Sequence, residues 1–385
     1  MFHYSVERFN NGNESNASLF LDSASFDRNP VHIIASGVIL GTIILFTLTG
    51  NTLVVIAVLG YRRLQTVTNF LLLSLAIADL TVALLVMPFS LVYEVYGSWT
   101  FGYIFCHFWL SCDVMCCTAS ILNLCIISLD KYWAITRPLT YKVNSKRRVI
   151  NMVVFVWGCS GTISFIPIFM GWYADSNHPV LHDPYFCGLQ VNHTYAIISS
   201  LTSFYVPLPI MLFTYSRIYS VARFQAAKIR NELKHIHCFN PSQRQTVRRQ
   251  IRSLVREHKA VRTLGIIMGV FIFCWLPFFL MYLILPFCPK CNMSDMLKSA
   301  LTWLGYANSF LNPLIYAFFH RDFRKSFKLI LCARNIRFKG GAFQQDNSNL
   351  MSRDTMSLAN SNNANDDSSL RLSAIDNVNN CTSTT

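Results

Sequence analysis

Charged residues are scarce in this 385-residue sequence: they make up 14%, whereas hydrophobic residues make up 52%. Seven apolar runs are long enough to cross a bilayer, and they contain two acids, Asp79 and Asp113, with no lysine or arginine. Buried helices of a soluble protein would be shorter and more amphipathic. The composition therefore predicts an all-α membrane protein, a bundle of seven transmembrane helices. The runs are 32–60, 69–93, 104–129, 149–172, 194–216, 263–288 and 299–319.

Features that several functional classes require are also missing. The runs hold no cluster of metal ligands and no nucleophile with a neighbouring base, which argues against an enzyme. An ion-coupled transporter would need several intramembrane charges and usually an internal repeat. The seventh run carries Tyr306, Asn308 and Ser309 but no lysine, so it does not fit a light sensor that binds retinal. Because residues 1–29 are polar, we expect no cleavable signal peptide.

The net charge of +14 is distributed unevenly around the runs. Basic residues concentrate in 62–63, 137–148, 217–262 and 321–328, whereas the alternate connections hold little beyond Lys290 and Lys298. The positive-inside rule then predicts a multi-pass plasma-membrane protein with an extracellular N-terminus and a cytoplasmic C-terminus. The basic excess marks a cytoplasmic face beside anionic lipid, so we do not expect binding to nucleic acid.

This topology divides the chain into four parts. We expect an extracellular, glycosylated N-terminus (1–31), a seven-helix transmembrane domain (32–319), a short amphipathic eighth helix on the membrane surface (320–332) and a disordered cytoplasmic tail (333–385). Cys332, at the end of the amphipathic segment, is a candidate for palmitoylation. Sequons on the outer side predict glycosylation at Asn13, Asn16, Asn192 and Asn292.

The third run carries an acid at each end of its membrane path. Asp113 and Asp130 lie about 25 Å apart on a helix, close to the depth of the hydrocarbon core. One acid therefore faces the outer half, where a ligand can reach it, and the other faces the cytoplasm. The pattern indicates a device that reads one side of the membrane and reports to the other.

Only four of the 13 cysteines fall on the predicted outer side, where a disulfide can form. Cys106 begins the third run and Cys187 precedes the fifth, which makes them the natural pair. Cys288 and Cys291 would then close a small local loop. Four cysteines allow three pairings, so both bonds are predictions.

Several short motifs stand in one order along residues 40–332. They are Gly50-Asn51, residues 75–79, the Cys106/Cys187 pair, Trp157, Pro207 with Tyr215, Cys274-Trp275-Leu276-Pro277 and residues 312–316 (Asn-Pro-Leu-Ile-Tyr). Each motif is weak alone. Together they resemble the rhodopsin-like G-protein-coupled receptors, and the resemblance covers most of the chain.

Within that family the chain resembles the biogenic amine receptors. Asp113 stands where these receptors keep the counter-ion of the ammonium group, and Trp275, Phe278 and Phe279 match their aromatic floor. A carboxylate and flanking rings suit a small protonated aromatic amine, through an ion pair and cation–π contact. Trp303 matches a family residue that closes over the amine. Without Asp113 beside them, all of these aromatic residues would be interpreted as core packing. The resemblance implies these ligand-binding residues: Asp113, Val114, Cys117, Ser199, Ser200, Ser203, Trp275, Phe278, Phe279, Tyr282, Thr302 and Tyr306.

Three serines precede Pro207 in the fifth run. Ser199 and Ser203 lie four residues apart, on one helical face, with Ser200 alongside. In amine receptors the matching serines bind ring hydroxyls, although small residues also serve close helix packing. Three serines together favour the ligand role, because unpaired hydroxyls in a membrane are costly.

The resemblance also implies how a signal crosses the bundle. Ile121, Pro207 and Phe271 match a central packing trio, and a pocket for sodium and water is implied at Asp79, Ser120, Asn308, Ser309 and Asn312. The residues implied in activation and coupling are Asp130, Lys131, Tyr132, Tyr215, Glu257, Ile121, Pro207, Phe271, Asn312, Pro313 and Tyr316. The chain departs from the family at Lys131, where the family has arginine. Lysine keeps the positive charge but lacks the planar guanidinium group, which can pair with two partners at once. This weakens the expected contact with Glu257 that locks the inner face in the inactive state.

The resemblance therefore predicts a cell-surface receptor for an amine of the octopamine, tyramine, dopamine or serotonin kind. It implies a stimulatory heterotrimeric G protein acting on adenylate cyclase, arrestin and receptor kinases on the tail, and no cofactor apart from an allosteric sodium ion. Thr302 replaces the asparagine that reads the hydroxyl of adrenaline, which argues against adrenaline itself. A histamine-type receptor is the alternative ligand class, and an ion-coupled transporter is the alternative of a different class.

Overall fold

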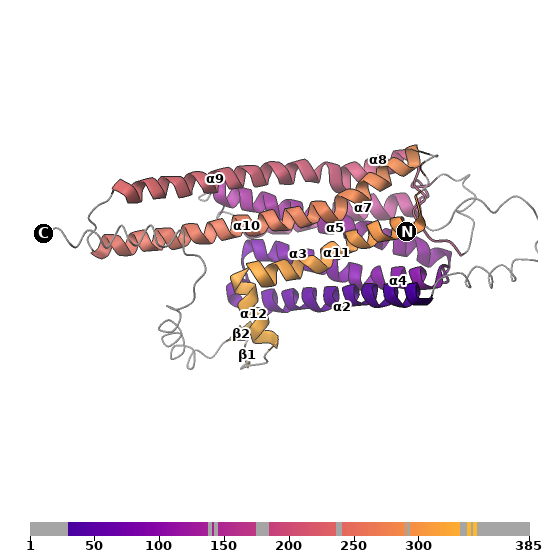
Figure 1. Cartoon of the computed structure of the whole chain (residues 1–385), viewed down its shortest axis with the longest axis horizontal. Helices are drawn as coiled ribbons and strands as arrows, with labels where there is room; N and C mark the ends of the chain where they lie inside the picture. Colours follow the sequence, from indigo (N-terminus) through magenta and orange to yellow (C-terminus); the bar gives the residue numbers. More distant parts are fainter. Residues whose placement is uncertain are drawn as a thin grey trace, which may run out of the picture.

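The computed structural model describes residues 30–137, 141, 145–174, 185–235, 241–288, 291, 293–331, 337–339 and 342–344; the side chains at 30–32, 145, 228–260 and beyond 331 lie outside that description. Long helices run side by side along the long axis of the molecule (Figure 1). The elements are α2 (Pro30–Gly60), η2 (Arg62–Leu64), α3 (Val67–Leu85), α4 (Met87–Tyr96), α5 (Tyr103–Thr136), α7 (Ser145–Phe169), α8 (His193–Ser200), the π-helical turn η4 (Leu201–Tyr205), α9 (Pro207–His235), α10 (Pro241–Ile284), η5 (Leu285–Phe287), α11 (Asp295–Phe319) and α12 (Arg321–Leu331). Two short antiparallel strands follow, β1 (Arg337–Lys339) and β2 (Ala342–Gln344).

Six paths through the described bundle are both long and apolar enough to cross a membrane: Ile33–Gly60, Val67–Tyr96, Tyr103–Thr136, Lys146–Phe169, His193–Ala227 and Val261–Phe287. The seventh predicted span corresponds to α11, whose 25 residues are long enough to cross. It is less apolar because it carries Asn308, Ser309 and Asn312, which are buried within the bundle. The seventh helix is therefore less hydrophobic than the other six because one of its faces presents polar residues to the interior of the bundle.

Two of these paths are interrupted helices. The second breaks at Val86, between α3 and α4, with Pro88 in the first turn of α4, where the missing proline N–H is tolerated. The fifth contains η4, in which Val206 donates its backbone N–H to the Leu201 carbonyl, five residues earlier. Pro167 has little helix to bend, because α7 ends two residues later.

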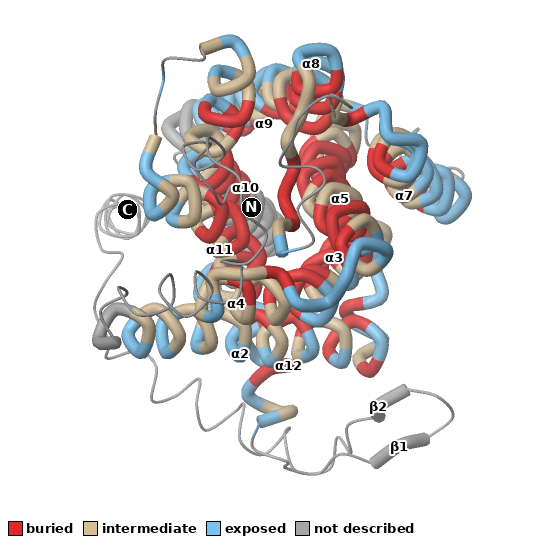
Figure 2. The backbone as a smooth tube through the Cα atoms, turned by 90° about the vertical axis from the view of Figure 1, so that its right-hand side faces the viewer, coloured by how far each residue is buried: buried red, intermediate tan, exposed pale blue. Residues whose placement is uncertain are grey.

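Helix α5 forms the centre of the bundle and packs against α3, α7 and α9. Seen along the bundle, buried segments of α5, α3 and α11 face inward, whereas α7 exposes its outer side (Figure 2). Large apolar side chains such as Phe46, Val154 and Phe155 are exposed on α2 and α7. A membrane-spanning bundle presents such residues to lipid, and polar residues to its own interior.

Glycine permits the close approach of helices at two points that shape the interior. A Cβ at Gly50 on α2 would lie 2.9 Å from the Cβ of Pro313 on α11. A Cβ at Gly305 on α11 would lie 3.0 Å from the Trp275 ring on α10. Any larger residue would push these helices apart, so glycine fixes the position of α11 between its neighbours.

The predicted eighth helix is present as α12, which turns away from α11 at the end of the bundle where α9 and α10 extend furthest (Figure 1). Phe323 and Phe327 are buried against the bundle, and the Phe323 ring lies 5.7 Å from that of Tyr316. Its basic residues, Arg321, Arg324, Lys325 and Lys328, suit a helix that lies on an anionic leaflet.

Candidate functional site

A cavity opens in the half of the bundle that contains the first turns of α5. Residues of α5, α8, η4, α10 and α11 surround it, and one loop residue joins them. Its lining is Asp113, Val114, Cys117, Thr118, Leu189, Ser199, Ser203, Trp275, Phe278, Phe279, Tyr282, Thr302 and Tyr306. The structure thus brings together eleven of the twelve residues predicted to bind a ligand.

Asp113 supplies the only carboxylate of this lining. It is buried, with 6% of its surface exposed, and its Oδ1 accepts a long hydrogen bond from the Cys117 thiol, 3.4 Å from the sulfur. The Tyr306 hydroxyl lies beside it, but in the described structure it completes no hydrogen bond. A thiol is a weak donor, so the carboxylate keeps most of its capacity to bind a cation.

Aromatic rings form the floor and one wall of the cavity. The ring of Trp275 meets that of Phe278 edge-on at 5.8 Å, and Phe278 meets Phe279 in the same way at 5.4 Å. Tyr282 stacks on Phe278 at 5.8 Å. Ring faces and edges packed this way give a rigid apolar surface that binds a second aromatic ring. Trp303, expected to close over an amine, packs edge-on against Tyr306 outside the lining.

The three serines of the fifth helix fall into different environments. Ser199 donates to the Tyr195 carbonyl, and its Oγ lies 3.1 Å from the Tyr282 hydroxyl. Ser203 Oγ lies 2.9 Å from Thr118 Oγ1 on α5. Ser200 does not line the cavity, and its buried hydroxyl has no hydrogen-bond partner among the described residues. The two serines at the cavity therefore connect the fifth helix to two other helices.

Two lining residues, Thr118 and Leu189, were not predicted. Thr118 follows Cys117 and completes the pattern of positions 113, 114, 117 and 118, one face of an α-helix, so helical periodicity could have identified it. Leu189 lies in a loop with no periodicity. Its only sequence signal is its position two residues after Cys187.

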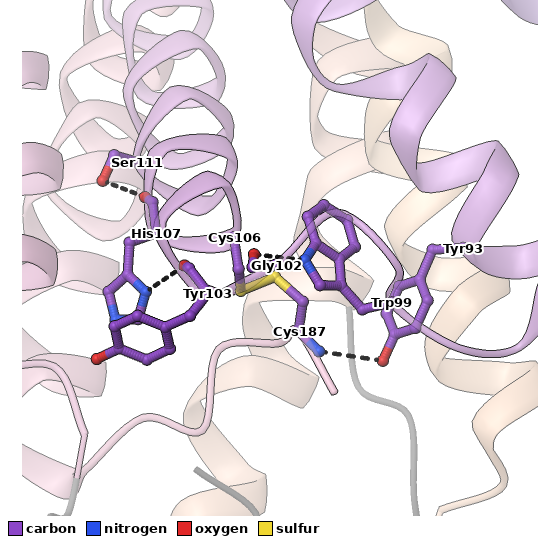
Figure 3. Close-up of a disulfide and its surroundings, with 8 residues drawn as sticks. All are labelled: Tyr93, Trp99, Gly102, Tyr103, Cys106, His107, Ser111 and Cys187. Carbon is purple, nitrogen blue, oxygen red and sulfur yellow. Dashed lines mark hydrogen bonds between the residues drawn. A yellow bond between two sulfur atoms is a disulfide. The ribbon is translucent and has the colours of Figure 1, made fainter. Parts of the chain in front are cut away.

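A disulfide fixes that loop over the cavity. Cys106, near the start of α5, is bonded to Cys187, with Cα atoms 5.8 Å apart. Around the bond, Trp99 donates its indole N–H to the Gly102 carbonyl, and the Cys187 N–H points to the Tyr93 hydroxyl at 3.4 Å (Figure 3). These contacts position the loop that brings Leu189 into the cavity lining. The second predicted bond, Cys288–Cys291, is also present.

Deeper in the bundle, Asp79 accepts hydrogen bonds from three side chains. Its carboxylate accepts from Ser120 at 2.9 Å, Ser309 at 2.8 Å and Asn312 at 2.9 Å. Asn308 lies on α11 beside Ser309, and both polar atoms of its side chain are buried without partners among the described residues. These are the residues predicted for a sodium and water pocket. Carboxylate and amide oxygens, with polar atoms still unpaired, fit a hydrated cation.

The predicted central trio lies between the cavity and the inner end. Ile121 and Phe271 are fully buried, and the Cys125 thiol contacts the carbonyl of Pro207 at 3.9 Å. Phe204 in η4 contacts both the cavity floor and the trio, because its ring centroid lies 4.6 Å from that of Phe279 and 5.6 Å from that of Phe271. A continuous stack of rings therefore connects the cavity to the trio.

At the inner end, Asp130 is held by donors from two directions. Thr68 donates to Oδ2 at 2.9 Å, and the Tyr141 hydroxyl lies 3.0 Å from both carboxylate oxygens. Burial, reinforced by the Asp130 charge, raises the pKa of Tyr141 to about 12, so its hydroxyl remains a donor at neutral pH. Lys131 donates to Thr68 Oγ1 at 3.2 Å. The side chain of Glu257, its expected partner in the lock, lies outside the described residues.

The other coupling residues surround this end. Tyr132 and Tyr215 pack on a buried cluster that includes Ile218 and Leu264. Pro313 and Tyr316 are buried in α11, and the Tyr316 hydroxyl has no partner among the described residues.

Of the predicted modification sites, only Asn192 falls in the described chain. It caps α8 by accepting from the Tyr195 N–H at 2.8 Å, and its Nδ2 donates to the Trp172 carbonyl at 2.9 Å. A glycan on Nδ2 would have to share that nitrogen with the bond to Trp172. Asn13, Asn16, Asn292 and Cys332 lie outside the described residues.

Residues 50–316 match the family described as 7 transmembrane receptor (rhodopsin family). The D(1C) dopamine receptor of Xenopus laevis is 46% identical over 315 residues, which cover 77% of this chain and 67% of the relative. The Octopamine receptor beta-2R of Drosophila melanogaster is 42% identical over 320 residues, covering 75% of this chain and 60% of the relative. A Probable G-protein coupled receptor No18 of Amphibalanus amphitrite is 39% identical over 349 residues, covering 79% and 91%.

The matches agree with the predicted bundle of membrane-spanning helices and with the expectation that the chain is not an enzyme. The chain covers 60 to 67% of the dopamine and octopamine receptors named above. The family match includes both acids of the third helix, the serine face and the aromatic floor. This chain belongs to the rhodopsin family of seven-transmembrane receptors.

Proposed function

We propose that the chain is a G-protein-coupled receptor for a small protonated aromatic amine, which binds in the cavity around Asp113. One observation carries the proposal: a buried carboxylate with a single weak hydrogen bond faces a cavity walled by aromatic rings. A buried charge of this kind is costly until a partner compensates it. An ammonium group meets that need, and the rings bind the rest of the ligand.

The relatives narrow the ligand class. Their names identify them as receptors for dopamine and octopamine, both of which are amines with a hydroxylated aromatic ring. Ser199 and Ser203 line the same cavity as the aspartate and can bind such a hydroxyl. We infer a phenolic, catechol or indole amine. A histamine-type ligand remains an outcome that an amine panel would reveal.

The ligand acts by shifting the equilibrium between two arrangements of the bundle. Contacts on Trp275 and Phe279 reach Phe271 through Phe204, and α10 and α9 extend from there to the inner end. We infer that rearrangement there opens a cytoplasmic surface to a stimulatory G protein, with arrestin and receptor kinases acting on the tail. This requires an extracellular N-terminus, a topology that the basic residues of α12 and of residues 137–148 support.

The test is a cyclic AMP assay in cells expressing the full chain, with a panel of amines that includes dopamine, octopamine, tyramine, serotonin and histamine. We expect a rise in cyclic AMP with a hydroxylated aromatic amine and none in Asp113→Asn, at equal surface expression. A fall in cyclic AMP would show that the chain couples to an inhibitory G protein instead of a stimulatory one. A response that survives Asp113→Asn would overturn the proposed binding site.

A further inference from the structure

The hydroxyl groups of Ser199 and Ser203 differ in whether a hydrogen is left to donate to a ligand. Ser199 contacts two oxygens, the Tyr195 carbonyl and the Tyr282 hydroxyl. A serine has a single hydroxyl hydrogen, and a carbonyl can only accept. The hydrogen of Ser199 is therefore committed to Tyr195, and in the 3.1 Å contact it is Tyr282 that donates. Neither hydroxyl then keeps a hydrogen for a ligand, although both keep lone pairs.

The second hydroxyl pair of the cavity has a different balance. Thr118 and Ser203 share one hydrogen bond of 2.9 Å and bring two hydrogens to it. One hydrogen is used between them and the other remains. This deeper pair can donate to a ligand or accept from it.

Burial makes the difference matter for a ligand. Ser199 and Tyr282 are each 5% exposed, so bulk water does not reach them freely. A ligand oxygen or halogen without a hydrogen would place its lone pairs against theirs and leave all of them unpaired. A ligand O–H or N–H would instead donate a hydrogen bond to these lone pairs.

We propose that Ser199 and Tyr282 form an acceptor-only end of the cavity, which selects amines whose ring carries a hydrogen-bond donor at that point. The donor is a phenolic hydroxyl, an aromatic amino group or an indole N–H. Ethers and halogens are discriminated against there, whereas the pair of Thr118 and Ser203 accepts either kind of group. Ser199 is the specificity-determining residue because its only hydrogen is bonded to the Tyr195 carbonyl, and Tyr282 contributes a second acceptor oxygen. The inference rests on the proposed amine ligand and adds which ring groups the site distinguishes.

The test uses phenethylamines with a hydroxyl, amino, fluoro or methoxy group at the meta or para position. Competition binding is measured on the full receptor and on Ser199→Ala, Ser203→Ala and Tyr282→Phe. The position that reaches Ser199 is the one whose hydroxyl loses affinity in Ser199→Ala. At that position we expect the hydroxyl and amino compounds to bind within about threefold of each other, and the fluoro and methoxy compounds about five- to tenfold more weakly.

The variants locate the preference. It should disappear in Ser199→Ala and persist in Ser203→Ala. It should also persist in Tyr282→Phe, which keeps the ring, because the hydrogen of Ser199 stays on the Tyr195 carbonyl. If Ser199 donated to Tyr282 instead, Tyr282→Phe would release its hydrogen and the fluoro compound would gain relative to the hydroxyl compound.

Besides that gain, two further results overturn the inference, and they are distinguishable. Asp113-dependent binding in which the fluoro compound equals the hydroxyl compound, or in which the preference survives Ser199→Ala, rejects the acceptor-only end and leaves the amine receptor intact. A failure of every compound to bind in an Asp113-dependent way rejects the proposed function and this inference with it.

Discussion

The outer and inner halves of the bundle treat their buried acids in opposite ways. Asp79 accepts three hydrogen bonds of 2.8–2.9 Å, and Asp130 is bound by Thr68 and Tyr141. Asp113, in the outer half, accepts one bond from a thiol at 3.4 Å. All three are buried, with at most 6% of their surface exposed. The fold therefore satisfies the acids that hold helices together and leaves unsatisfied the one that faces the cavity.

The difference separates stability from binding. Hydrogen bonds to a charged group contribute about 1.5–3 kcal/mol each, so the inner network stabilises the packing of α3, α5 and α11. An undersatisfied buried charge destabilises the empty receptor instead, and a ligand cation removes that cost. The inner acids should therefore control folding, and Asp113 should control affinity.

The largest expected effect is on binding. Asp113→Asn keeps the shape of the side chain and removes the charge, so the affinity for an amine agonist should fall by a hundredfold or more, given about 3–5 kcal/mol for a buried pair that loses one partner. Saturation and competition radioligand binding on membranes measure it, with surface expression as the control. Near-normal affinity would mean that the outer acid is structural after all.

Stability should show the reverse order. Asp79→Ala leaves the Ser120, Ser309 and Asn312 donors without their acceptor and should lower the free energy of unfolding by about 2 kcal/mol or more. The thermal midpoint of purified receptor should then drop by several degrees, while that of ligand-free Asp113→Asn should stay level or rise. The comparison between the halves fails if the two variants lose equal stability.

The inner lock should respond more modestly. Lys131→Arg restores a planar group that can pair with two partners, and one added hydrogen bond of about 0.5–1.5 kcal/mol would shift the activation equilibrium about two- to tenfold. Basal cyclic AMP should fall at matched receptor number. If Lys131 limits coupling rather than locking, the maximal agonist response should rise instead. No change in either quantity would show that the substitution is neutral.

The smallest effect concerns the serine that turns away from the cavity. Ser200→Ala removes a hydroxyl that neither lines the cavity nor finds a partner, so agonist affinity should stay within about twofold of the unmodified receptor. Ser203→Ala, the matched control on the same helix, should lower the affinity of a phenolic amine several-fold. Equal losses in both variants would show that Ser200 reaches the ligand in the bound state.

Much of the architecture could be predicted from the sequence, because hydropathy marks where helices cross a membrane and few polar residues are tolerated there. Asp79 and Asp113 were recognisable for that reason. Helical spacing placed Ser199 and Ser203 together, but it gave no warning that Ser200 would face elsewhere. Whether Ser200 meets the cavity depends on the rotation of α8, which η4 helps to set.

What the sequence could not supply depends on contacts between distant segments. Leu189 reaches the cavity because a disulfide draws its loop over α5. The partners of Asp130 include Tyr141, which lies eleven residues further along the chain. The break at Val86 and the π-helical turn arise from backbone hydrogen bonding, and neither has a residue signature as strong as an apolar run.

The π-helical turn at Leu201–Tyr205 affects which side chains of the fifth helix face the ligand cavity. It contains one residue more than an α-helical turn, and each residue of an α-helix advances the chain by about 100°. If the same residues took up regular α-helical hydrogen bonding, everything on the outer side of the turn, including Ser199, would rotate relative to α9. The inner half would keep its register. A switch of this one turn between π-helical and α-helical bonding would thus present a different set of side chains to the ligand without any change in sequence.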